Sequence, residues 1–72
     1  MGQFSPDAYD ALERAIANGG RLAMYRRGTE YVVVPERLRL LGGREAVECV
    51  HPNTGDRLTL YLDEVDSFEV VT

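Results

Sequence analysis

The stretch RLTLYLDEV, residues 57–65, carries the pattern that decides the fold class of this chain. Leucines at three alternate positions are separated by polar or amphipathic residues, which is the period of a β-strand with one buried face. We therefore expect a strand over residues 57–63, with Arg57 and Tyr61 on its other face. An arginine beside an aromatic ring on an open sheet face is typical of a surface on which nucleic-acid bases stack. Alternatively, Tyr61 packs beneath a helix with only its hydroxyl in solvent.

The remainder of the chain after residue 20 also favours short strands, because apolar residues recur with a period of two between turn-forming residues. Strands are expected over residues 21–27, 30–35, 37–41, 44–51, 57–63 and 66–71. The sequences Arg27-Gly28-Thr29 and Gly42-Gly43 predict tight turns. Pro35 indicates a strand end or a sheet edge, because proline cannot donate a hydrogen bond to a neighbouring strand.

A helix is expected before these strands, over residues 6–18. Ser5 is a typical N-cap residue, and Pro6 suits the first helical position because its φ angle is already helical. Apolar residues follow at three- and four-residue spacing, which predicts one apolar stripe. Gly19 then supplies the left-handed backbone that ends many helices.

One helix followed by five or six short strands has few compact arrangements in 72 residues. We expect a mostly β fold, a small SH3-like or Sm-like β-barrel of five or six antiparallel strands, because a closed barrel removes exposed strand edges. The sequence contains no internal repeat or linker, which indicates a single domain over residues 1–72. A chain of this length has a thin core, so a deep catalytic cleft is not expected.

Composition restricts the partners and the compartment. The formal net charge is −4, from 12 acidic residues and 8 arginines, which disfavours tight nonspecific binding to a polyanion. Cys49 is the single cysteine, so an intrachain disulfide cannot form, and its apolar neighbours favour a core position over a nucleophile. No signal peptide or long apolar segment is present, and we expect a cytoplasmic protein without membrane contact.

The usual catalytic patterns are absent from the sequence. No glycine-rich loop opens a helix, and His51 stands without neighbouring metal ligands. In a strand over residues 57–63 that continued one residue further, Asp63 and Glu64 would point to opposite faces, which disfavours a paired-carboxylate site. We therefore expect a noncatalytic protein with no cofactor and no metal.

Residues 11–71 resemble the WYL domain, a bacterial SH3-like or Sm-like module that is usually attached to DNA-binding domains in transcription regulators. The ordered matches are the helix ending in Ala15-Ile16, the strand carrying Tyr25, Pro35 before Leu38, the Gly43 hairpin, the Thr54-Gly55 turn, and Leu60-x-Leu62-Asp63-x-Val65. The resemblance implies a regulatory module that binds a nucleotide or nucleic-acid effector.

The chain departs from the WYL pattern at the residues that give the family its name and its effector contacts. The naming tripeptide would fall at Glu45-Ala46-Val47, which has neither its tryptophan nor its tyrosine. Glu64 stands where the family commonly has an arginine, and a second family arginine would fall at Leu58. The resemblance therefore implies a WYL-type fold with an altered effector pocket.

A second resemblance is to the Rof family, small acidic Sm-like inhibitors of the termination factor Rho. It rests on Tyr9-Asp10-Ala11-Leu12-Glu13 and on Leu62-Asp63-Glu64-Val65-Asp66-Ser67-Phe68. This resemblance implies an acidic protein-interaction module that inhibits a nucleic-acid-binding partner.

Two functions follow from these observations. The first is a WYL-like regulatory binding module that senses a nucleotide or a short single-stranded nucleic acid, with ligand-binding residues Tyr25, Arg26, Arg57 and Tyr61. The alternative is the Rof-like module, which would contact a protein of the transcription machinery through Asp63, Glu64, Asp66 and Glu69. Assembly into a homo-oligomer is compatible with either function, because a thin-cored domain gains stability by associating. The sequence leaves open the strand register at Tyr25 and Tyr31, and therefore also the face to which these two side chains point.

Overall fold

A helix of 13 residues, α1 (Pro6–Asn18), begins the structure, which is a computed structural model describing residues 4–71. The Ser5 side chain accepts a hydrogen bond of 3.2 Å from the backbone N–H of Ala8, so Ser5 is the N-cap that the sequence predicts. Gly19 ends the helix with a φ of 67°, in the left-handed region where a side chain is costly. The predicted bounds of the helix are therefore confirmed.

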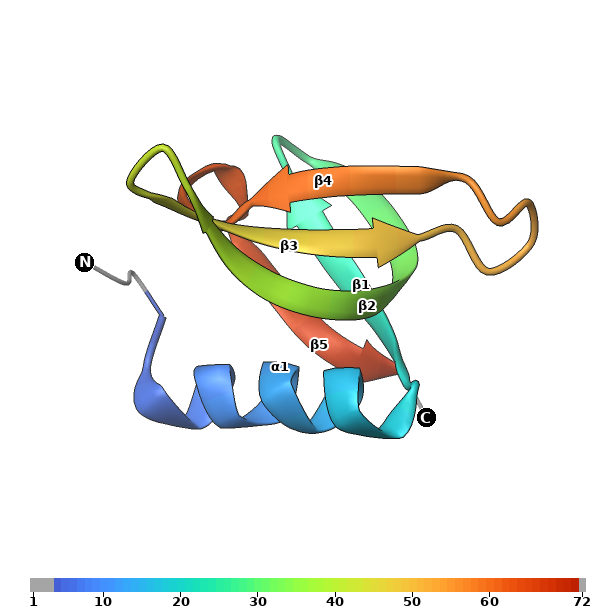
Figure 1. Ribbon diagram of the computed structural model, residues 1–72, viewed down its shortest axis with the longest axis horizontal. Coiled ribbons are helices and arrows are strands. Elements are labelled where there is room, and N and C mark those ends of the chain that lie inside the picture. The colour runs from blue at the N-terminus through green and yellow to red at the C-terminus, as the bar shows by residue number, and fades with distance from the viewer. Residues whose placement is uncertain (1–3, 72) are drawn as a thin grey trace.

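Five antiparallel strands and one short helical turn follow α1 (Figure 1). They are β1 (Arg21–Arg26), β2 (Thr29–Leu41), β3 (Arg44–Val50), β4 (Arg57–Tyr61), the 3₁₀ helix η1 (Leu62–Glu64) and β5 (Ser67–Val71). The hydrogen-bonded order of the strands is β4-β3-β2-β1-β5. The mostly β fold class with an N-terminal helix is confirmed.

β2 is a single strand of 13 residues, where the sequence predicts two strands separated at Pro35. Its first part pairs with β1 and its second part pairs with β3, with a shift of register between Pro35 and Arg37. Pro35 lies opposite Cys49 at this irregularity, which tolerates the missing N–H and lets the strand bend. The prediction of a strand end at Pro35 was therefore wrong, and the curved β2 joins both parts of the sheet (Figure 1).

The sheet is strongly bent but does not close into the expected barrel. Within residues 4–71, β4 and β5 form its two edges, and no ladder joins them. The predicted strand over residues 57–63 ends at Tyr61, because the chain turns through η1, where the backbone N–H of Val65 donates to the Leu62 carbonyl at 3.2 Å. This turn carries the chain from one edge of the sheet to the other.

The concave side of the sheet and α1 enclose one hydrophobic core. α1 packs on β2 and β5 and contributes Leu12 and Ala15, while the alternation in β4 buries Leu60, as predicted. The fully buried or nearly buried members of this core are Leu12, Ala15, Leu22, Met24, Val33, Val47, Cys49, Leu60, Leu62 and Val65. Because Leu62 and Val65 belong to the core, the backbone of η1 is anchored at both of its ends.

Candidate ligand-binding site

The four ligand-binding residues predicted from sequence do not form one site: Arg26 and Tyr61 belong to one cluster, described below, whereas Tyr25 and Arg57 make other contacts. Tyr25, on β1, has its hydroxyl 3.2 Å from a carboxylate oxygen of Glu30 and 3.2 Å from one of Glu69, and the hydrogen bond to Glu30 is the main cause of its raised pKa. Arg57 and Tyr61 lie at opposite ends of β4, about 13 Å apart along the strand. A single small ligand therefore cannot contact all four residues.

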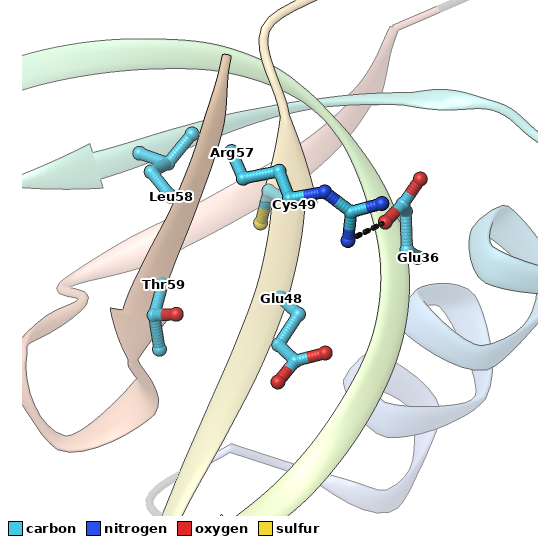
Figure 2. Close-up of a pocket in the computed structure, with 6 residues that line it drawn as sticks. All are labelled: Glu36, Glu48, Cys49, Arg57, Leu58 and Thr59. Atoms are coloured by element: carbon cyan, nitrogen blue, oxygen red, sulfur yellow. Dashed lines mark hydrogen bonds and ion pairs between the residues drawn. The ribbon is translucent and has the colours of Figure 1, made fainter. Parts of the chain in front are cut away.

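Arg57 borders a small pocket of about 150 Å³, and Figure 2 shows its side chain reaching from β4 across β3 to Glu36 on β2. The ion pair between Arg57 Nη1 and Glu36 Oε1 is 3.4 Å long. The lining residues are Glu36, Glu48, Cys49, Arg57, Leu58 and Thr59. With two carboxylates and one guanidinium, this pocket is unsuited to an anionic ligand.

Cys49 does not supply a reactive thiolate to this pocket. Its side chain is buried, and burial, assisted by the negative charge of Glu36, raises its pKa to about 12. The thiol lies 3.5 Å from the carbonyl oxygen of Val47. Within residues 4–71, no group of three or more His, Cys, Asp or Glu side chains is arranged to hold a metal ion.

Arg44, at the start of β3, donates three side-chain hydrogen bonds to the two carboxylates of Asp63 and Glu64. Its Nε and Nη2 atoms donate to the two carboxylate oxygens of Asp63 at 2.8 Å and 2.7 Å, which is a bidentate geometry. Its guanidinium carbon lies 3.9 Å from the centre of the Tyr61 ring. These hydrogen bonds raise the pKa of Arg44 and lower the pKa of Asp63.

Arg26, at the end of β1, repeats this combination of a guanidinium and a tyrosine ring. Its guanidinium carbon lies 5.0 Å from the centre of the Tyr31 ring, and its Nη2 atom donates to the Tyr31 hydroxyl at 3.1 Å. The two residues come from neighbouring strands that pair in the β1–β2 hairpin. The hairpin register therefore fixes this second arginine and tyrosine pair.

Glu64 connects the two pairs. Its Oε1 atom lies 3.6 Å from Nη1 of Arg26, and its Oε2 atom accepts a hydrogen bond of 3.1 Å from Nη2 of Arg44. We call the six residues that meet here the arginine–tyrosine cluster: Arg26, Tyr31, Arg44, Tyr61, Asp63 and Glu64. The cluster contains residues from four strands and from η1, and the Glu64 carboxylate lies between its two guanidinium groups.

The expectation that Asp63 and Glu64 point to opposite faces was wrong. It assumed strand geometry, whereas the two residues lie in η1, where successive side chains are turned by about 120° and can reach one partner. Both carboxylates consequently bond to Arg44. The contact is a paired-carboxylate clamp on an arginine.

The two other carboxylates predicted to bind a protein partner contact groups that are not members of the cluster. Asp66 accepts a hydrogen bond of 3.1 Å from the backbone N–H of Arg27 and so supports the β1–β2 turn. Glu69 lies on β5, within 3.2 Å of the Tyr25 hydroxyl. Each of the four predicted acidic residues therefore contacts a group of the described chain.

Sequence reasoning missed Arg44 and Tyr31 as members of this site. The pairing of β3 with β4 places Tyr61 opposite Ala46, two residues after Arg44, so that the arginine can reach diagonally across to the ring. That register could have been inferred from the turn at residues 52–55. The position of η1, which brings both carboxylates to Arg44, had no sequence signal that we recognised.

Comparison with known proteins places this geometry in a wider context. No protein-family profile and no curated protein matches the sequence. The structure is similar to part of the proteasome accessory factor B/C (PafBC) of Arthrobacter aurescens, with a TM-score of 0.75 and 25% identity over 97% of this chain. The chain spans only 12% of the length of that PafBC chain. PafBC is a transcription regulator that contains a WYL domain, which supports the resemblance of this sequence to WYL domains.

Proposed function

We propose that this chain is a noncatalytic, WYL-like regulatory binding module that senses a nucleotide or a short single-stranded nucleic acid in transcription regulation. The observation that carries the proposal is the arginine–tyrosine cluster, in which two guanidinium groups contact the Glu64 carboxylate and each also contacts a tyrosine ring from a neighbouring strand. The similarity to part of PafBC supports a regulatory role.

The cluster combines the two chemical features that nucleotide binding requires. Guanidinium groups donate paired hydrogen bonds to phosphate oxygens, and aromatic rings and guanidinium planes stack on bases. Arg26 and Tyr61 are members of the site predicted from sequence, and Arg44 and Tyr31 complete the set. Tyr25 and Arg57 lie elsewhere, so the proposed ligand contacts do not include them.

The acidic character of the chain sets the expected strength of binding. The overall charge of −4 provides no general attraction for a polyanion, so affinity must come from this local cluster. Each phosphate contact to a single strand contributes a slope of roughly −0.7 to the dependence of log affinity on log salt concentration. We expect a small slope, equivalent to one or two phosphate contacts.

A titration followed by NMR tests this proposal. The ligands are adenosine monophosphate, cyclic adenosine monophosphate and a five-residue oligothymidylate, each at low salt. We expect shifts at the side chains of Arg26, Arg44 and Tyr61, and we expect the variant Arg44→Gln to bind at least tenfold more weakly.

The matched control is Arg57→Gln, which removes an arginine whose ion pair, with Glu36, lies at the opposite end of β4 from Tyr61. It should leave the titration unchanged. An absence of shifts for all three ligands would contradict the proposal, as would equal losses in the two variants.

The acidic protein-interaction alternative receives less support from the contacts. Each of Asp63, Glu64, Asp66 and Glu69 already interacts with a group of the same chain, through Arg44, Arg26, the backbone N–H of Arg27, or Tyr25. A partner with a basic site would have to replace those contacts.

A further inference from the structure

Glu64 occupies the centre of the arginine–tyrosine cluster, in the place where a ligand anion would be bound. Its two oxygens face different guanidinium groups, Oε1 toward Arg26 at 3.6 Å and Oε2 toward Arg44 at 3.1 Å. We propose that the Glu64 carboxylate masks a binding site for a terminal phosphate group, a phosphomonoester, and that the ligand binds by displacing it. This inference rests on the proposed function and specifies its ligand class and its regulation.

Charge favours a phosphomonoester over a phosphodiester at this position. The two arginines carry two positive charges, and Asp63 and Glu64 balance them. A phosphomonoester carries between −1.5 and −2 charges at neutral pH and presents three acceptor oxygens, whereas the glutamate carries one charge and two oxygens. A phosphodiester offers the same single charge as the glutamate, so it gains little by replacing a carboxylate that is already tethered.

Because the ion pairs of Glu64 are exposed to solvent, breaking them costs little free energy. The side chains of Arg26, Arg44 and Glu64 are 30%, 43% and 36% exposed, and ion pairs with such exposure contribute little to stability. Leu62 and Val65 anchor the backbone of η1 in the core, so the proposed displacement is a rotation of the Glu64 side chain on a fixed backbone. The group that the ligand displaces is thus the Glu64 side chain alone, and the backbone that carries it stays in place.

Asp63 has a different role from Glu64 in this arrangement. Its bidentate contact, at 2.7 Å and 2.8 Å, fixes the plane of the Arg44 guanidinium over the Tyr61 ring. That contact involves Nε and Nη2 and persists when Glu64 rotates away. Asp63 is therefore a positioning residue, while Glu64 is the group that the ligand replaces.

The test compares Glu64→Gln with the unaltered chain and with a matched control, Glu36→Gln. Both substitutions remove one negative charge from an arginine ion pair, but Glu36 pairs with Arg57 at the opposite end of β4. The probes are adenosine monophosphate, its cyclic diester, and five-residue oligothymidylate with and without a 5′-phosphate. Melting temperatures and backbone NMR spectra confirm that each variant is folded.

We expect Glu64→Gln to bind adenosine monophosphate roughly tenfold more tightly than the unaltered chain does, because a competing charge is removed next to the ligand. Glu36→Gln should bind as the unaltered chain does. The preference of Glu64→Gln for the monoester over the cyclic diester, and for the 5′-phosphorylated oligonucleotide, should be at least severalfold. Adding Arg44→Gln to Glu64→Gln should abolish the gain.

Three results would overturn the inference, and one of them also removes the proposed function. Equal affinity of Glu64→Gln and the unaltered chain for the monoester overturns the masking role but leaves nucleotide binding intact. Equal affinity of Glu64→Gln for monoester and diester overturns the phosphomonoester class. Failure of every variant to bind any of the four probes overturns both this inference and the function on which it rests.

Discussion

Replacing Tyr9 by phenylalanine tests how α1 is held against the sheet. The Tyr9 hydroxyl donates a hydrogen bond of 2.6 Å to Oε1 of Glu45, a residue 36 positions away at the start of β3. The phenylalanine ring would keep the edge-on contact with Phe4, whose ring centre lies 6.4 Å away. The substitution therefore removes the hydrogen bond and leaves the apolar packing.

The expected loss follows from the ionisation of Tyr9. The hydrogen bond to Glu45, with smaller contributions from burial and from the glutamate charge, raises the pKa of Tyr9 from 10.0 to about 12. Two pKa units correspond to an upper limit of about 2.7 kcal/mol. Because the hydrogen bond is only partly buried, we expect solvent screening to reduce the loss to about 1 kcal/mol. In a domain of this size such a loss lowers the melting temperature by roughly 4–8 °C.

The raised pKa of Tyr9 also predicts how the stability difference between the two proteins changes with pH. A folded-state pKa above the unfolded value means that the stabilisation is complete below pH 10 and is lost as the pH rises through about 12. Urea unfolding at several pH values should therefore show a constant difference between the two proteins up to pH 9. That difference should shrink steadily between pH 10 and 12. Other groups that titrate in alkali, such as Cys49, are present in both proteins and cancel.

Two results would refute this reasoning. One is an unfolding free energy at pH 7 that is the same for both proteins. The other is a difference that stays constant up to pH 12, which would show that the hydroxyl stabilises the fold without the Glu45 charge. A double-mutant cycle with Glu45→Ala measures the coupling directly, and we expect it to account for most of the Tyr9→Phe effect.

Three further outcomes are expected from the structure. Leu60→Ala removes a core side chain that is 1% exposed, and urea unfolding should show a loss of about 2–5 kcal/mol; a loss below 1 kcal/mol would contradict its place in the core. The Cys49 thiol, with its pKa raised to about 12, should react with a thiol reagent at pH 7.5 only as fast as the protein unfolds, and rapid labelling of the folded protein would contradict its burial. The carboxyl carbon of Asp63 should titrate below pH 3.8 in NMR, and Arg44→Gln should raise its midpoint; an unchanged midpoint would show that the Arg44 contact is not formed in solution.

The helix could be predicted residue by residue because its signals are local. Ser5 caps the first turn and Gly19 ends the last one, and both act through contacts within four residues of the chain. The strands after it were placed nearly as well, because a period of two and a turn sequence are also local features. The alternation in residues 57–61 buries Leu60, and Leu58 is partly buried against the core.

Two parts of the fold depended on distant contacts and were not predicted. Pro35 is tolerated inside β2 because the register shift against β3 removes the need for its missing N–H. No neighbouring residue in the sequence predicts that irregularity. The turn η1 replaces the end of a predicted strand because the chain must pass from β4 to β5, which lie at opposite edges of the sheet. Both features are consequences of the sheet order.

The candidate site shows the same division. Tyr61 was identified from residue type and face, and Arg26 was named although the register of its strand was left open, but Arg44 required the register of β3 with β4. The position of Glu64 between two guanidiniums required the geometry of η1. The resemblance to WYL domains implies that Glu64 stands where that family commonly has an arginine, whereas only the structure shows which charges the glutamate neutralises.

The position of a bound nucleotide tests the central claim most directly. Intermolecular nuclear Overhauser effects between adenosine monophosphate and the Glu64→Gln variant would locate the base and the phosphate. We predict contacts from the adenine protons to the ring of Tyr61 or Tyr31, together with shifts of the Nε–H groups of Arg26 and Arg44. Contacts that instead map to Arg57 and the pocket around Glu36 would contradict the assignment of the arginine–tyrosine cluster as the ligand site.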